Sequence, residues 1–254
     1  MRPAQRNAWL PLYQHEPDAS LRLFCFPHAG GNAQAFRTWP KRLGPKYEIC
    51  AVQTPGRWNR YQEPPISHFP TLVEMVTSAL KESFAQPFAL FGHSVGALLA
   101  FEVARDLRRK GLPEPQYLFL AGRRAPTIHQ SEPPISSLSD EALIAFISDR
   151  FGAIPEPVLN DPEMLKMIMP LLRTDLELAQ NHTYVAEPPL KSPIAVFGGT
   201  SDRTTLPSWL EAWREQTSAH FNVEIFPGGH FFLDTARDHV LTSVDRLCQA
   251  ATER

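Results

Sequence analysis

Short runs of consecutive apolar residues recur along the chain, and segments with helical spacing lie between several of them. Because the runs are mostly apolar, we interpret them as strands that are buried on both faces of a sheet and not as half-exposed strands. The predicted strands cover residues 21–26, 47–52, 88–91, 117–121, 194–197 and 222–226.

Apolar residues spaced three and four positions apart predict helices between these strands. Such helices are predicted around residues 72–80, 98–107, 207–213 and 240–248. Thr71 and Glu74 have the spacing of a capping box, which predicts that the first of these helices begins there. Strands that alternate with helices predict an α/β fold with a mostly parallel central sheet flanked by helices.

Residues 126–191 interrupt this alternation, so we expect a core made of residues 1–125 and 192–254 with an insertion between them. Ser139 and Asp161 are typical residues for the start of a helix, and an apolar stripe follows each of them. We interpret the insertion as a helical lid over a binding site.

The composition is that of an ordinary globular chain. Of 254 residues, 43% are hydrophobic and 20% are charged, which supplies enough apolar surface for a core. The 25 Lys and Arg residues nearly balance the 27 Asp and Glu residues, so nothing favours nucleic acid or an anionic membrane as a partner. No apolar run approaches the roughly 20 residues of a spanning helix, and the first residues lack the apolar stretch of a secretory signal. Three scattered cysteines predict neither a disulfide framework nor a zinc site and favour a cytoplasmic location.

Glycines gather at the ends of the predicted strands. Most of the 13 glycines lie just after a strand, and some are paired, as at residues 30–31, 198–199 and 228–229. Open parallel sheets bind ligands beyond the carboxyl ends of their strands, where glycine lets the backbone turn sharply. The pattern therefore predicts a functional edge of the sheet, although glycine is also common in turns without any function.

One glycine pair frames a candidate nucleophile. Residues 92–96 read Gly-His-Ser-Val-Gly and lie between a predicted strand and a predicted helix. In that context G-x-S-x-G predicts a tight turn that exposes the oxygen of Ser94, and side chains in place of Gly92 and Gly96 would collide with neighbouring backbone. The N–H of Val95, at the start of the helix, would then stabilise an oxyanion.

A serine nucleophile needs a general base and an acid that orients the base, and in this type of fold the acid and then the histidine follow the serine along the chain. Asp202 and His230 each follow a predicted strand, so we assign them these roles. Asp175 and Asp234 are weaker candidates for the acid. His28 and Ala29 end the first strand, and we expect the Ala29 N–H to be the second oxyanion donor and His28 to contact the substrate.

The second predicted helix of the insertion contains three of the five methionines, Met164, Met167 and Met169. Methionine adapts to irregular partners, so we expect Met164, Met167, Ile168 and Leu172 to contact an apolar part of the substrate. The alternative is that these methionines belong to an ordinary apolar core.

These motifs together resemble a known family. The sequence resembles the type II thioesterases, free-standing editing enzymes that serve nonribosomal peptide and polyketide synthases. The matching motifs extend over nearly the whole chain: Phe26-Pro27-His28-Ala29-Gly30-Gly31, Pro55-Gly56-Arg57 followed by Arg60 and Glu63-Pro64, Gly92-His93-Ser94-Val95-Gly96, Pro170-Leu171-Leu172-Arg173-Thr174-Asp175, Gly198-Gly199 before Asp202, and Phe226-Pro227-Gly228-Gly229-His230-Phe231-Phe232-Leu233.

The resemblance implies an α/β-hydrolase fold with a helical lid and hydrolysis of acyl or aminoacyl thioesters on the phosphopantetheine arm of a carrier. It implies that Ser94, Asp202 and His230 form the triad, with Ala29 and Val95 as oxyanion donors. It implies no metal and no cofactor, because phosphopantetheine enters with the substrate. The implied partners are acyl or peptidyl carrier protein domains, and we expect a monomer.

Arg57 and Arg60 follow a loop at the same edge, and we expect them to contact an acidic carrier domain or a phosphate. The basic residues 105–110 are better explained as charges that complement a helix C-terminus. A small-molecule esterase, an acyl-CoA thioesterase, an acyltransferase or cyclase, and a catalytically inactive binding module stay open as alternatives.

Overall fold

The centre of the molecule is a six-stranded sheet in which neighbouring strands are parallel. The computed structural model describes residues 7–129, 132–152, 154 and 156–252. The strands are β1 (Leu21–Phe26), β2 (Tyr47–Ala51), β3 (Phe88–His93), β4 (Tyr117–Ala121), β5 (Ile194–Gly199) and β6 (Phe221–Phe226). Their spatial order is β2-β1-β3-β4-β5-β6, which confirms the predicted α/β class.

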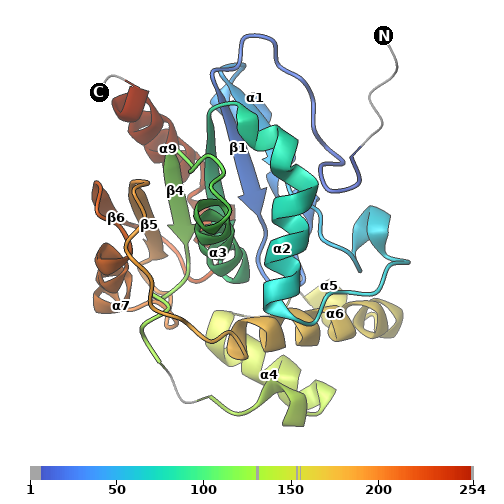
Figure 1. The fold of residues 1–254 in the computed structure, drawn as a ribbon. Helices are drawn as coiled ribbons and strands as arrows, with labels where there is room; N and C mark the ends of the chain where they lie inside the picture. Colours follow the sequence, from blue (N-terminus) through green and yellow to red (C-terminus); the bar gives the residue numbers. More distant parts are fainter. Residues whose placement is uncertain (1–6, 130–131, 153, 155, 253–254) are drawn as a thin grey trace.

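Successive side chains of each strand enter two different apolar clusters, one on each face of the sheet. Phe24 of β1 packs with the helices α2 (Phe69–Leu80) and α3 (Val95–Arg109). Leu23 packs on the opposite face with α1 (Trp39–Leu43) and α9 (Arg237–Thr252). Helices therefore cover both faces (Figure 1), which explains why the strand segments are mostly apolar.

The other described helices are short or belong to the insertion. They are α4 (Asp140–Phe151), α5 (Glu156–Leu159), α6 (Pro162–Gln180), α7 (Pro207–Glu211) and α8 (Phe232–Thr235), with 3₁₀ turns at Ala33–Phe36, Trp58–Arg60, Lys81–Ala85, Ile135–Ser137 and Ala212–Gln216. Within the part of the chain that the structure describes, none of the helices combines the length and the apolar character needed to cross a membrane.

Helices α4, α5 and α6 lie across the carboxyl ends of the strands (Figure 1). Ser139 and Asp161 begin α4 and α6 as predicted, since their side chains accept hydrogen bonds from the first turns of these helices. Leu143, Ile147 and Met169 form a small buried cluster within this segment. Met169 is thus an ordinary core residue, and the segment has an apolar centre of its own.

Two predicted details are wrong. Strand β6 is not buried, because it lies at the edge of the sheet, and 43% of Ile225 is exposed. Helix α2 begins at Phe69, so Thr71 does not cap it and instead forms a hydrogen bond with the His68 ring. Pro70 explains the earlier start, because proline lacks an N–H to be capped and has the backbone angle of a first helical turn.

The strand register brings several loops to one place. Phe26 at the end of β1 lies opposite Gly92 of β3, and His93 lies opposite Ala121 at the end of β4. The loops that follow β1, β3, β4, β5 and β6 therefore meet at one edge of the sheet, beneath α4 and α6.

Candidate active site

Ser94 occupies the sharp turn between β3 and α3. Its backbone has φ 57° and ψ −115°, a conformation that L-residues rarely adopt, and its N–H donates to the Ala121 carbonyl at 2.8 Å. A Cβ at Gly92 would lie 2.1 Å from the carbonyl oxygen of Gly96, and one at Gly96 would lie 2.2 Å from that of Phe26. The predicted collisions are confirmed, and they explain why both positions need glycine.

Ser94, His230 and Asp202 are joined by hydrogen bonds although their positions are far apart in the sequence. His230 Nε2 lies 3.0 Å from Ser94 Oγ, and His230 Nδ1 lies 2.9 Å from Asp202 Oδ2. All three residues are buried. An imidazole that bridges a hydroxyl and a carboxylate in this way can remove the hydroxyl proton while the carboxylate stabilises the resulting imidazolium.

Thr204 completes the surroundings of the carboxylate. Its N–H and its hydroxyl both donate to Asp202 Oδ1, at 2.8 and 2.7 Å. Burial alone would raise the pKa of Asp202, but the hydrogen bond and charge of His230 together with the Thr204 bonds lower that pKa to about 2. The acid is therefore ionised throughout the neutral range.

His93 holds the backbone of His230 by a hydrogen bond. Its Nε2–H donates to the backbone carbonyl of His230 at 2.9 Å, and the two rings lie 5.2 Å apart. Burial and the neighbouring histidines His230 and His28 lower the pKa of His93 well below its ordinary value. A neutral His93 can keep this donor in place and fix the backbone of His230.

The loop of residues 28–31, which we call the oxyanion loop, lies beside Ser94 and is held by the insertion. The Gly30 N–H donates to Asp175 Oδ2 of α6 at 2.8 Å, and the Gly31 N–H donates to the His28 carbonyl. Among the described residues the Ala29 N–H has no intramolecular acceptor. Val95 is the first residue of α3, where a helix leaves its N–H groups free.

Arg57 links Asp175 to the same loop, so the structure places neither Arg57 nor Arg60 at the surface for the expected contact with a carrier domain. Arg57 donates from both terminal nitrogens to Asp175, at 2.9 and 2.8 Å, and from Nη1 to the Gly31 carbonyl. Arg60 donates to Glu63 and to the Gln53 carbonyl. Both guanidinium groups are buried and already paired, so neither is available at the surface.

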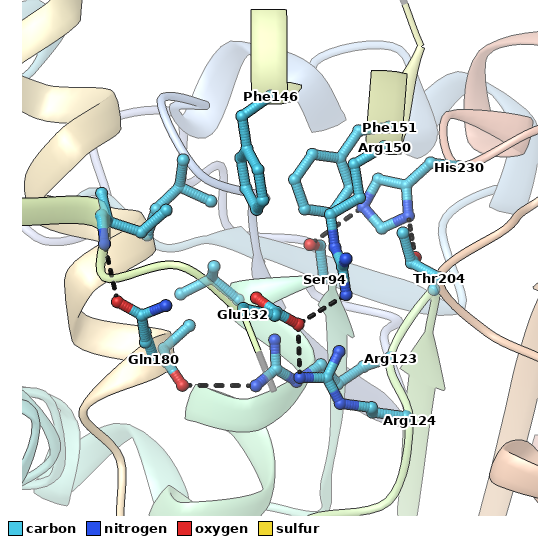
Figure 2. A pocket seen from close by; sticks show the side chains of 15 residues that line it. Ser94, Arg123, Arg124, Glu132, Phe146, Arg150, Phe151, Gln180, Thr204 and His230 are labelled. Carbon is cyan, nitrogen blue, oxygen red and sulfur yellow. Dashed lines mark hydrogen bonds and ion pairs between the residues drawn. The ribbon is translucent and has the colours of Figure 1, made fainter. Parts of the chain in front are cut away.

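A small pocket opens at Ser94 and His230 beneath the insertion (Figure 2). The Phe151 ring lies 4.7 Å from the His230 ring and shields the imidazole from water. The apolar side of the pocket is formed by Ile135, Phe146, Phe151 and Leu176, and the polar side by Arg123, Arg124, Glu132, Arg150 and Gln180.

The residues expected to contact substrate do not line this pocket. Met164 and Met167 lie on the outer side of α6, where 37% and 67% of their areas are exposed, so the structure does not bring either of them to this pocket. The His28 ring packs instead against Phe231, in a separate small pocket. Ile168 lies outside the lining residues, as does Leu172, which packs against Gly30 of the oxyanion loop.

Several residues of the site were not found from the sequence. Thr204 follows Asp202 by two positions, where a hydroxyl commonly bonds to an aspartate in a turn, and this signal would have identified it. Asp175 was considered only as a rival acid, since its partner Arg57 is 118 positions away. No spacing rule points to Phe146 or Arg123.

Comparisons with known proteins agree with this geometry. The family model for the thioesterase domain matches residues 21–248. Gramicidin S biosynthesis protein GrsT of Aneurinibacillus migulanus is 40% identical over 230 residues, which cover 91% of this chain and 90% of that protein. The structure of the RedJ thioesterase from the prodiginine pathway of Streptomyces coelicolor is 38% identical with a TM-score of 0.84, covering 97% of this chain and 96% of that one. The type II thioesterase BorB from the borrelidin cluster is 34% identical with a TM-score of 0.82, covering 92% and 96%.

Proposed function

Because the chain belongs to the thioesterase domain family, we propose that it hydrolyses acyl and aminoacyl thioesters on the phosphopantetheine arm of acyl or peptidyl carrier domains. The resemblance to type II thioesterases that the motifs indicate is confirmed by the family model and by these relatives. Such hydrolysis removes wrong or stalled acyl groups and regenerates the carrier thiol.

The observation that carries the proposal is the hydrogen-bonded chain from Ser94 through His230 to Asp202. His230 takes the proton of Ser94 as the serine oxygen attacks the thioester carbonyl. The N–H groups of Ala29 and Val95 stabilise the oxyanion, and each such donor contributes roughly 3 kcal/mol in comparable sites. His230 then protonates the leaving sulfur, and water repeats the sequence on the acyl-enzyme.

The insertion, residues 126–191, acts in this proposal as a lid. Phe151 of α4 lies over His230, and Asp175 of α6 holds the oxyanion loop. The same segment therefore excludes water from the imidazole and orients the loop that contains Ala29.

Mass spectrometry of a butyryl-loaded carrier tests the proposal. We expect the purified protein to convert the loaded carrier to the free thiol form, and we expect Ser94→Ala to leave it loaded. A second measurement compares kcat/KM for the same acyl group on a carrier, on coenzyme A and on an oxygen ester, with the carrier substrate preferred by at least about tenfold. Loss of the acyl group at the same rate with Ser94→Ala, or a preference for the oxygen ester, would contradict the proposal.

A further inference from the structure

The pocket at Ser94 has more positive than negative charge. Its lining includes Arg123, Arg124 and Arg150, whereas Glu132 is its one carboxylate among the described residues. Figure 2 shows Arg150 extending toward Glu132 from above, with Arg123 and Arg124 below Ser94. An apolar acyl group would not need these charged side chains.

Arg124 and Arg150 share the carboxylate of Glu132. Glu132 Oε1 accepts from Arg124 Nη2 at 2.9 Å and also from Arg150 Nη2. Within the described part of the chain, the Arg123 guanidinium has no carboxylate partner, and its one hydrogen bond runs from Nη2 to the Ala179 carbonyl at 3.5 Å. A contact of that length satisfies little of a guanidinium with five donors.

An incompletely paired guanidinium in a partly buried site is costly and points to a ligand that completes its bonds. Burial and the charges of Arg124 and Arg150 lower the pKa of Arg123 to about 10, so that the group is still charged at neutral pH. The surrounding protein thus leaves a positive charge in the pocket without an anion of its own.

Arg123 is also fixed close to the reacting groups. It follows Gly122, where a Cβ would lie 3.5 Å from Cε1 of His230. The Trp213 indole N–H donates to the Arg123 carbonyl at 2.8 Å and holds its backbone. The pocket volume is about 40 Å³, where one water needs roughly 10–15 Å³, so only a short acyl group fits without movement of the lid.

We propose that the polar side of this pocket binds a carboxylate at the far end of a short acyl group, with Arg123 as the residue that recognises it. The proposal rests on the proposed thioesterase function and adds a substrate class, short dicarboxylic acyl groups such as malonyl. Arg123 takes no part in bond breaking. It positions the acyl chain with its thioester carbonyl at Ser94.

N-acetylcysteamine thioesters test this proposal, because they lack the phosphate of phosphopantetheine. The malonyl thioester, its neutral monoamide of the same size and the butyryl thioester are compared by the release of free thiol. We expect the wild-type protein to cleave the malonyl thioester with a kcat/KM at least about tenfold above that of the monoamide. Equal values for the two would overturn the carboxylate subsite, and this comparison needs no variant.

Variants then assign the effect to Arg123. We expect Arg123→Gln to lower the ratio of kcat/KM for the malonyl thioester to kcat/KM for the butyryl thioester by roughly 10- to 100-fold. We expect Arg123→Lys to recover part of the loss. Arg214→Gln is the control, since 66% of that side chain is exposed and it lies outside the pocket lining.

Two other outcomes have different meanings. If Arg123→Gln slows only substrates that carry the phosphodiester of coenzyme A or a carrier, the guanidinium binds that group and the carboxylate subsite is overturned. If the wild-type protein leaves even the butyryl thioester intact, the proposed thioesterase function fails.

Discussion

Asp175 connects the lid to the oxyanion loop, so its replacement should affect both stability and turnover. The carboxylate accepts from Gly30 at 2.8 Å and from Arg57 at 2.9 and 2.8 Å, and both side chains of the ion pair are buried. Removing one partner of a buried pair costs about 3–5 kcal/mol, because the other charge is left without compensation. In a protein of this size each kcal/mol lowers the melting temperature by roughly 2–4 °C, so we expect Asp175→Asn to lower it by about 6–20 °C.

Turnover should fall for a separate reason. Asp175 fixes the Gly30 N–H, which lies next to the proposed oxyanion donor Ala29. Complete loss of one oxyanion donor lowers kcat by about 10²- to 10³-fold. Since Asp175→Asn displaces the donor instead of removing it, we expect kcat to fall by roughly 10- to 100-fold, with KM changed by less than about threefold.

A double variant separates the two effects. Arg57→Leu combined with Asp175→Leu leaves no buried charge, so we expect it to regain most of the stability while kcat stays low. Asp140→Asn is the matched control, because Asp140 also pairs with an arginine within the lid, Arg173, but has 61% of its side chain exposed. That control should lose less than about 1 kcal/mol and keep its kcat.

Urea unfolding followed by circular dichroism gives the stabilities, and thiol release from a butyryl thioester gives kcat and KM. If Asp175→Asn keeps a wild-type kcat, or if the double variant recovers both stability and kcat, Asp175 is a structural residue and the argument for positioning is refuted.

Three further predictions concern the elbow and the acid. Ser94→Ala should lower kcat by at least about 10⁴-fold and abolish labelling by a fluorophosphonate probe, with the melting temperature changed by no more than about 2 °C; a large fall would mean that the serine hydroxyl also supports the fold. Gly96→Ala should strongly lower the melting temperature or abolish folding, since the new Cβ would lie 2.2 Å from the Phe26 carbonyl oxygen. Gly229→Ala, where a Cβ meets nothing within 4 Å, should keep the wild-type melting temperature. The lowered pKa of Asp202, from 3.8 to about 2, stabilises the folded state above about pH 4, and this stabilisation is lost as the pH falls toward 2. The difference in unfolding free energy between wild type and Asp202→Asn should therefore shrink by about 2 kcal/mol over that range in urea titrations, and a difference independent of pH would refute the assigned pKa.

The strands and the elbow could be predicted because short-range rules govern them. A strand buried on both faces must be mostly apolar, and all six predicted runs form strands, five of them largely buried. The elbow requires glycine at position 92 for a reason within the turn, the Gly96 carbonyl, whereas Gly96 is required by the Phe26 carbonyl at the end of β1. The edge position of β6 depends on which strands pair with which, although Asn222 and Glu224 within its run already indicate incomplete burial.

The pocket lining could not be predicted, because an apolar helix face does not indicate whether it packs against the core, a ligand or another helix. Helix α6 presents Leu176 to the pocket, whereas Met167, about two and a half turns earlier in the same helix, is exposed to solvent. The flexibility of methionine suggested contact with a ligand, but the orientation of the helix over the sheet decides the contact. That orientation depends on Asp175 and its distant partner Arg57.

The two arginines Arg57 and Arg123 show how a structure distinguishes roles that a sequence cannot. Arg57 is paired with Asp175 through two hydrogen bonds and bonds to the Gly31 carbonyl as well. A buried pair of this kind contributes little net stability, but it is strongly directional, which suits the positioning of a loop. The Arg123 guanidinium has one long hydrogen bond and no carboxylate partner among the described residues, which suits a group that binds an anionic ligand. The presence or absence of a carboxylate partner, and not the residue type, therefore decides which arginine supports the catalytic machinery and which recognises the substrate.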